Sequence, residues 1–148
     1  MTTYNSPAVS LNSPVAVHGE FKAINHLHET VTVSAGLTTA DTLNIGYLPP
    51  NAVVTSVKLK APTQLDSNGA PTLAFNMGIS GTPALFKSAI TTVGRAAGAS
   101  VDETVAAAGL LYKNTTGSKV LVTVTPSANA ATGVAGTIEA AISYFVEE

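Results

Sequence analysis

Apolar and polar residues alternate along most of the chain, and a period of two predicts β-strands with one buried face. The first alternation covers residues 15–23, the second covers 27–33 and is broken at Gly36, and the third covers 43–47. Pro49-Pro50 ends the third, because proline has no N–H to donate to a ladder. The apolar positions are Val15, Val17, Phe21 and Ala23, then Leu27, Val31 and Val33, then Leu43, Ile45 and Tyr47, with Glu29 on the apolar side as an imperfection.

Four later segments also alternate, at 53–60, 72–79, 120–124 and 138–146. Their polar phase carries residues such as Lys58 and Lys60, which predicts that this face of the strand meets solvent. Nine side chains on the apolar phase are expected to point into one core: Val57, Leu59, Leu73, Phe75, Met77, Val122, Val124, Ile138 and Ile142.

The connections carry turn residues. Asp66-Ser67-Asn68-Gly69 ends in an Asn-Gly pair, which suits a tight turn and predicts a hairpin between the strands on either side. Residues 110–113, 120–124 and 138–146 are expected to form a three-stranded meander. From Pro83 to Ala108 the period of two is lost, and a long loop with a short helix is predicted from the spacing of Leu85, Phe86, Ala89, Ile90 and Val93.

These elements predict an all-β fold: an antiparallel β-sandwich, jelly-roll-like, with seven or eight strands. A parallel sheet would need crossover helices, which the sequence does not supply. Residues 1–13 are polar and read as an extended N-terminal arm, and 14–148 as a single sandwich domain of ordinary size.

Composition narrows the function classes. Charged residues make up 11% of the chain, against about a quarter in an average protein, and this favours a surface that is partly covered in an assembly. We therefore expect a homo-oligomer, most simply a trimer. No direct nucleic-acid partner is expected, because the seven basic residues form no stripe: Lys22, Lys58, Lys60, Lys87, Arg95, Lys113 and Lys119.

The remaining composition fits synthesis in a reducing cytoplasm. The chain has no cysteine, which removes disulfides, thiolate metal sites and thiol catalysis. It also has no apolar run of about 18 residues and no basic start followed by an apolar stretch, so neither a membrane partner nor a secretory signal is expected.

Candidate chemistry is sparse. His18, His26 and His28 are the only imidazoles that a metal site could use, but no acidic cluster accompanies them, and exposed strand positions explain them better. Two carboxylate pairs, Asp102-Glu103 and Glu147-Glu148, are sequence neighbours on a loop and a tail rather than partners across a cleft. We predict no enzyme activity, no catalytic residues, no cofactor and no metal.

Three short motifs have simpler explanations. Gly78-Ile79-Ser80-Gly81 and Gly94-Arg95-Ala96-Ala97-Gly98 lack the endings of phosphate-binding and dinucleotide-binding loops and read as turns. Asn114-Thr115-Thr116 matches a glycosylation acceptor, which we interpret as a chance match in a chain without a secretory signal.

The segment Asp41-Thr42-Leu43-Asn44-Ile45-Gly46-Tyr47-Leu48-Pro49-Pro50-Asn51-Ala52-Val53-Val54, a later Gly81-Thr82, and the closing strand Gly136-Thr137-Ile138-Glu139-Ala140-Ala141-Ile142-Ser143-Tyr144 resemble a pattern of small virion proteins of tailed bacteriophages. These look like capsid decoration or cement proteins, and the resemblance covers residues 37–146. It carries no functional residue over one by one.

The resemblance implies a structural virion protein, made in the cytoplasm of the host bacterium. As a decoration protein it would bind the major capsid protein on the capsid exterior, often as a trimer, and stabilise the shell. The N-terminal arm and the loop from Pro83 to Gly109 are the expected contacts. The alternative is a carbohydrate-binding or adhesin-type β-sandwich from a phage fibre or tail, which would display an aromatic platform or a calcium site.

Overall fold

The fold is a sandwich of two β-sheets. The computed structural model describes residues 1–6, 24–34, 36–96, 100–103 and 109–147. Within them lie nine strands and no helix: β1 (Thr3–Asn5), β2 (Asn25–Val33), β3 (Thr42–Leu48), β4 (Ala52–Lys60), β5 (Ala74–Ile79), β6 (Thr82–Ile90), β7 (Ser100–Glu103), β8 (Val120–Ala128) and β9 (Gly136–Val146). Accordingly, no helix of the described part is long and apolar enough to cross a membrane.

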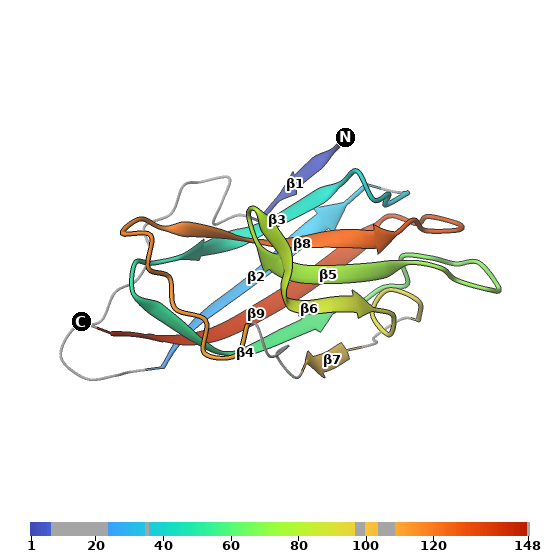
Figure 1. Cartoon of the computed structure of the whole chain (residues 1–148). Helices are drawn as coiled ribbons and strands as arrows, with labels where there is room; N and C mark the ends of the chain where they lie inside the picture. Colours follow the sequence, from blue (N-terminus) through green and yellow to red (C-terminus); the bar gives the residue numbers. More distant parts are fainter. Residues whose placement is uncertain (7–23, 35, 97–99, 104–108, 148) are drawn as a thin grey trace.

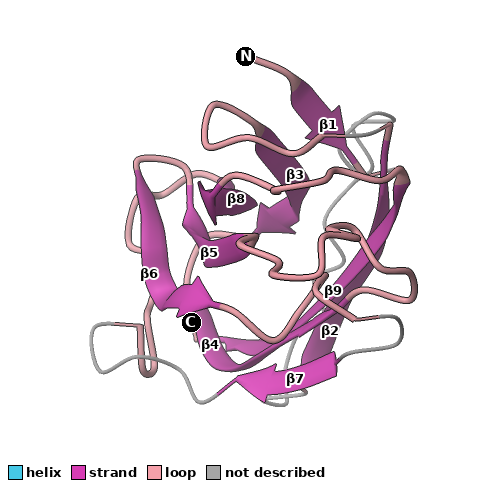
Figure 2. Ribbon diagram, turned by 90° about the vertical axis from the view of Figure 1, so that its right-hand side faces the viewer, coloured by secondary structure: helices cyan, strands magenta, loops and turns pink. Residues whose placement is uncertain are grey.

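One sheet has the strand order β1-β3-β8-β5-β6 and the other the order β2-β9-β4-β7 (Figure 1). Seen from the side, the two sheets form two layers (Figure 2). All the ladders between strands are antiparallel except that of β1 with β3, which is parallel. The predicted antiparallel sandwich is therefore confirmed, with one parallel strand that the sequence did not reveal.

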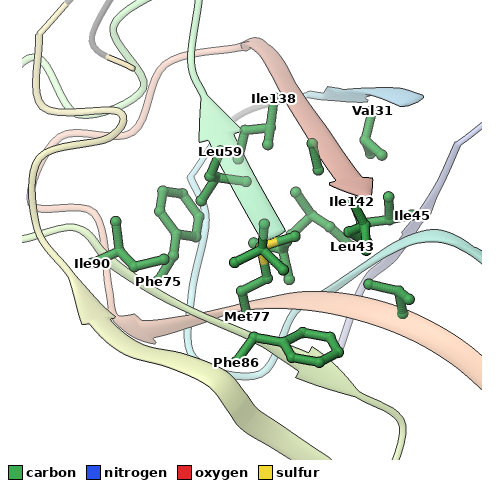
Figure 3. Close-up of a cluster of buried hydrophobic side chains, with 14 of the residues drawn as sticks. Val31, Leu43, Ile45, Leu59, Phe75, Met77, Phe86, Ile90, Ile138 and Ile142 are labelled. Carbon is green, nitrogen blue, oxygen red and sulfur yellow. The ribbon is translucent and has the colours of Figure 1, made fainter. Parts of the chain in front are cut away.

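The core lies between the layers and is built from apolar side chains of β2–β6, β8 and β9 (Figure 3). All nine side chains predicted to be in the core are buried, each at 0 or 1% exposure. In β9 the alternation is complete from Ile138 to Tyr144. Lys58 and Lys60 are exposed, as their phase predicts.

The predicted hairpin at Asn68-Gly69 is wrong. β4 and β5 lie in different sheets, so the connection between them crosses from one layer to the other. The predicted C-terminal meander is wrong for the same reason, since β8 and β9 also lie in different sheets. Residues 110–113 form a turn with an isolated bridge between Lys113 and Val53 instead of a strand.

The long loop with a short helix predicted from Pro83 to Ala108 is also wrong, because 82–90 form strand β6 and 100–103 form strand β7. Opposite β5, the register shifts so that Phe75 pairs with Ile90 and Met77 with Lys87. The extra residue is accommodated near Ala89, whose φ is 52°. Phe86 and Ile90 are both buried and lie four positions apart, a spacing that fits one face of a strand and also one face of a helix.

Some predictions fall outside the described residues: the strand predicted at 15–23 and residues 7–13 of the arm. The division into an arm at 1–13 and a domain at 14–148 stays a prediction. Thr3–Asn5 of the arm form β1, on the edge of the chain's own sheet.

Candidate functional site

The histidines do not form a cluster. His26 and His28 lie on the exposed face of β2, and the Nδ1 atom of His26 lies 3.0 Å from Ser143 Oγ. His18 lies outside the described residues. In the part of the chain that the structure describes, no three histidine or acidic residues come together in a way that could hold a metal ion. The absence of a metal site stays a prediction.

Of the two carboxylate pairs, one lies on β7 and the other begins directly after β9. Asp102 and Glu103 belong to β7, where only the backbone pairing with β4 is described. Glu147 forms an ion pair with Lys113, with Nζ and Oε2 2.9 Å apart and both side chains more than a third exposed. Glu148 lies outside the described residues.

The glycine segments are turns only in part, since Gly78 and Ile79 form the end of β5. Ser80 and Gly81 connect β5 to β6, and Gly81 has a φ of 87°. Gly94 has a φ of 83°, and its carbonyl accepts hydrogen bonds from the N–H groups of Leu65 and Asp66. Ala97 and Gly98 lie outside the described residues.

The Asn114 side chain is not available as a glycosylation acceptor. It is fully buried, and its Nδ2 donates to the carbonyls of Leu48, Pro49 and Ser118 at 3.3, 2.9 and 2.7 Å. Its Oδ1 accepts from the backbone N–H and the hydroxyl of Thr116. The amide therefore fastens segment 112–118 to the end of β3, which supports our interpretation of the motif as a chance match.

One end of the sandwich is held by a buried carboxylate that the sequence reading treated only as part of a turn. Asp66 is fully buried. Its Oδ2 accepts from the N–H groups of Thr72, Leu73 and Ala131 at 2.9, 3.1 and 3.0 Å. Its Oδ1 accepts from Thr132 at 2.9 Å and from Asn68 at 3.4 Å. One side chain thus joins the loop before β5 to the loop before β9.

Burial alone would raise the pKa of Asp66, because it disfavours the charged form. The four shorter N–H contacts outweigh burial and hold the pKa far below its ordinary value of 3.8. Backbone hydrogen bonds connect the neighbouring loops as well, from Ala130 to Leu37 and from Ser67 to Thr132. This end of the sandwich, drawn on the right of Figure 1, is therefore a tied framework rather than a reactive site.

The opposite end presents an apolar turn. Leu110 and Leu111 are 61% and 58% exposed, and the turn is closed by a hydrogen bond from Tyr112 N to Gly109 O at 3.1 Å. Leu111 has a φ of 53°, a conformation that normally belongs to glycine or asparagine.

The first and last residues of this turn pack closely against β6. Gly109 is buried, and a Cβ there would come within 2.4 Å of the Leu85 carbonyl oxygen. The Tyr112 ring meets the Phe86 ring edge to face at 6.0 Å between centroids. We call residues 109–112 the Leu110–Leu111 turn. It combines exposed apolar area with a strained backbone, and such outliers motivate a functional hypothesis.

The aromatic platform expected of a carbohydrate-binding module has no counterpart in the described residues, where every Phe and Tyr is at least partly buried. Tyr47, on β3, is covered by Lys119, whose Nζ lies 4.2 Å from the ring centroid.

Comparison with known proteins adds two findings. The chain is similar to a chain of the capsid asymmetric unit of cyanophage Pam1, with a TM-score of 0.72, 28% sequence identity, and coverage of 93% of this chain and 96% of that one. It is also similar to a chain of the capsid of Ralstonia phage GP4, with a TM-score of 0.79, 24% identity, and coverage of 99% and 98%. No protein-family model and no curated protein match the sequence. The chain thus shares its complete fold with chains of two phage capsids.

Proposed function

We propose that this protein is a structural component of a bacteriophage virion that decorates the outside of the capsid and stabilises it by binding the major capsid protein. The observation that carries the proposal is the likeness to the Pam1 capsid chain, which extends over nearly all of both chains at 28% identity. The protein would be made in the cytoplasm of the host bacterium.

The proposed working form is a homotrimer. The surface carries few charges, since only 11% of residues are charged, and it exposes an apolar turn. Both features are typical of a protein whose surface is partly covered by a partner. Light scattering on the purified protein should give the mass of three 14.9 kDa chains. A monomer at tens of micromolar that also fails to associate on shells would contradict the trimer.

The shell contact is proposed to include the Leu110–Leu111 turn, which follows directly after the 83–109 segment expected to make contact. The arm is retained as a second proposed contact through residues 7–13. Residues 2–6 are engaged in pairing with strand β3, so an arm contact with the shell would have to begin beyond Ser6.

The direct experiment uses heads of the phage that encodes this chain, assembled from a mutant lacking its gene. Purified protein is added, and the heads are imaged by cryo-electron microscopy and heated to release their DNA. We expect regular density on the outer surface and a higher release temperature. Heads that stay bare at saturating protein, or protein found only on tails, would refute decoration. Leu110→Ser should weaken attachment, while Thr30→Ser, a change at an exposed position on β2, should not.

We also propose that the sandwich has jelly-roll connectivity. With β1 set aside, the eight strands β2 to β9 divide into two four-stranded sheets in the orders β2-β9-β4-β7 and β3-β8-β5-β6. All ladders within these eight strands are antiparallel. This arrangement of eight strands is what supports the assignment.

A further inference from the structure

Strand β1 is a short element with a large number of specific contacts. It pairs with β3 in the register Thr3 to Thr42, Tyr4 to Leu43 and Asn5 to Asn44. The ladder is extended at both ends by backbone hydrogen bonds, from Thr42 N to Thr2 O at 3.1 Å and from Ser6 N to Asn44 O at 2.8 Å. A three-residue strand is therefore fixed in one register.

Side chains reinforce this register. The backbone N–H of Thr2 donates to Asp41 Oδ1 at 2.9 Å, and the Asn44 amide donates to Asn5 Oδ1 at 2.7 Å. Ser6 is fully buried and its hydroxyl donates to the Ile45 carbonyl. Tyr4 packs against the core. The edge of β3 thus makes a specific contact with each of residues 2–6. We call this edge the β1 slot.

No short turn connects β1 to the slot that it occupies. β1 is the parallel strand of its sheet, and its contacts are made to residues 39 positions later in the sequence. Nineteen residues, 6–24, separate β1 from β2. From Ser6 to Ile24 an extended chain spans at most about 60 Å, which is more than the diameter of a domain of this size. The same β1 can therefore reach the slot of its own copy or that of an adjacent copy.

Exchange between copies would conserve every contact in the slot, because an identical strand meets an identical edge. The balance between the two arrangements then depends on the linker and on how close the copies are held, and a pre-formed oligomer supplies that closeness. Around a threefold axis each copy gives one strand and receives one, so the exchange closes without leaving an empty slot.

We propose that β1 is exchanged: in the homo-oligomer, residues 2–6 of one copy occupy the β1 slot beside β3 of its neighbour. The occupant is a second copy of this chain, because the slot is complementary to this sequence residue by residue. The inference rests on the proposed homo-oligomer. It gives the oligomer a backbone connection between subunits in addition to surface contacts.

The test uses the lack of cysteine in the chain, so that engineered thiols are the only ones present. Asn5 and Asn44 face each other in the ladder, with their side chains in contact. Paired strands lie about 4.8 Å apart, and this spacing falls within the range of Cα–Cα distances that a disulfide can bridge. The double variant N5C/N44C is oxidised, run on a denaturing gel without reductant, and analysed by mass spectrometry. The same oxidised sample is examined by light scattering before it is denatured.

With exchange, oxidation should convert most of the protein into covalent oligomers that reductant separates into single chains. Monomers carrying an internal disulfide, in a sample that scatters as an oligomer, would overturn the exchange and leave the proposed oligomer intact. Scattering as a monomer would overturn both. A sample without any disulfide would show that β1 does not occupy the slot at all.

A mixing experiment provides the matched control. N5C and N44C chains carrying different tags are unfolded and refolded together, and exchange predicts a mixed disulfide between the two tags. N5C mixed with S127C should give no such product, because Ser127 is exposed on β8, away from the ladder. Equal yields from the two mixtures would mean random collision and would refute the inference.

Discussion

Asp66→Asn is the most informative single change for the framework of the fold. The substitution keeps the size of the side chain but replaces one acceptor oxygen with an NH2 group. Oδ2 accepts three short hydrogen bonds and Oδ1 one short and one long. The amide will therefore place its oxygen at the Oδ2 position and its NH2 group against the N–H of Thr132.

The magnitude follows from this geometry. Leaving a buried donor unpaired costs about 1–3 kcal/mol, and each of three bonds to a charged acceptor weakens by about 1 kcal/mol when the acceptor becomes neutral. Part of this is offset because a neutral amide is easier to bury than a carboxylate. We expect a loss of about 3–5 kcal/mol, a large share of the roughly 5–15 kcal/mol that stabilises a typical domain.

Urea unfolding followed by circular dichroism measures the loss, with Glu139→Gln as control. Glu139 also carries one carboxylate, but it lies on the surface, 3.7 Å from Lys60, and its removal should change stability by less than about 1 kcal/mol. A loss below about 1 kcal/mol for Asp66→Asn would show that the four short contacts do not carry the loop framework.

The same residue sets an acid dependence. The folded pKa of Asp66 lies below its ordinary value of 3.8, so the native state holds the charged form more strongly than the unfolded state does. Its contribution is complete above the unfolded pKa near 4, declines as the pH falls below that value, and is lost once the pH passes the folded pKa. Wild-type stability should therefore fall between about pH 4 and pH 2, and more steeply than that of Asp66→Asn. Parallel curves would refute the assignment.

Four further outcomes are expected. Phe75→Ala should cost about 3–5 kcal/mol, because the ring is fully buried in the core, and a loss under about 1 kcal/mol in thermal melts would contradict its position. Melting curves with and without a strong chelator should superimpose, whereas a lower midpoint with chelator would revive a site at His18, His26 and His28. Deleting residues 2–6 should lower the melting temperature, since it empties the β1 slot, and an unchanged temperature would show that β1 adds nothing. Leu111→Gly should raise stability by about 1 kcal/mol by relieving the positive φ while weakening attachment to heads, and unchanged attachment would remove the turn from the contact.

The sequence was sufficient for the strands that alternate without interruption. Val57 and Leu59 in β4, and Ile138 and Ile142 in β9, could be assigned to the core because a strand fixes alternate side chains on one face. In β6 the register shifts and the alternation is interrupted, since Ser88 and Ala89 are both exposed between buried Phe86 and Ile90. The remaining spacing of four residues fits one face of a strand and one face of a helix, so the period alone does not distinguish a strand from a helix.

The connections could not be predicted, for a different reason. An Asn-Gly pair favours a sharp turn, but a hairpin and a crossing between sheets bury the same apolar faces of β4 and β5. Long-range contacts decide between a hairpin and a crossing. Examples are the hydrogen bonds of Asp66 with Ala131 and Thr132, which lie 65 and 66 positions further along the sequence. Nothing local in the Asp66–Gly69 segment signals them. The exposure of Leu110 was missed because two leucines before a tyrosine also fit a strand.

The backbone strain at Leu111 bears on where a partner binds. Positive φ angles at Gly36, Gly81, Gly94 and Gly117 carry no steric cost, because glycine has no Cβ. Leu111 adopts a positive φ at a cost of about 1–3 kcal/mol, although its side chain is mostly exposed and returns little of that cost through burial in the monomer. Glycine would serve the turn better if only its backbone mattered. The proposed shell contact accounts for a leucine in this position, because covering the side chain in the assembly would offset the backbone strain of the free chain.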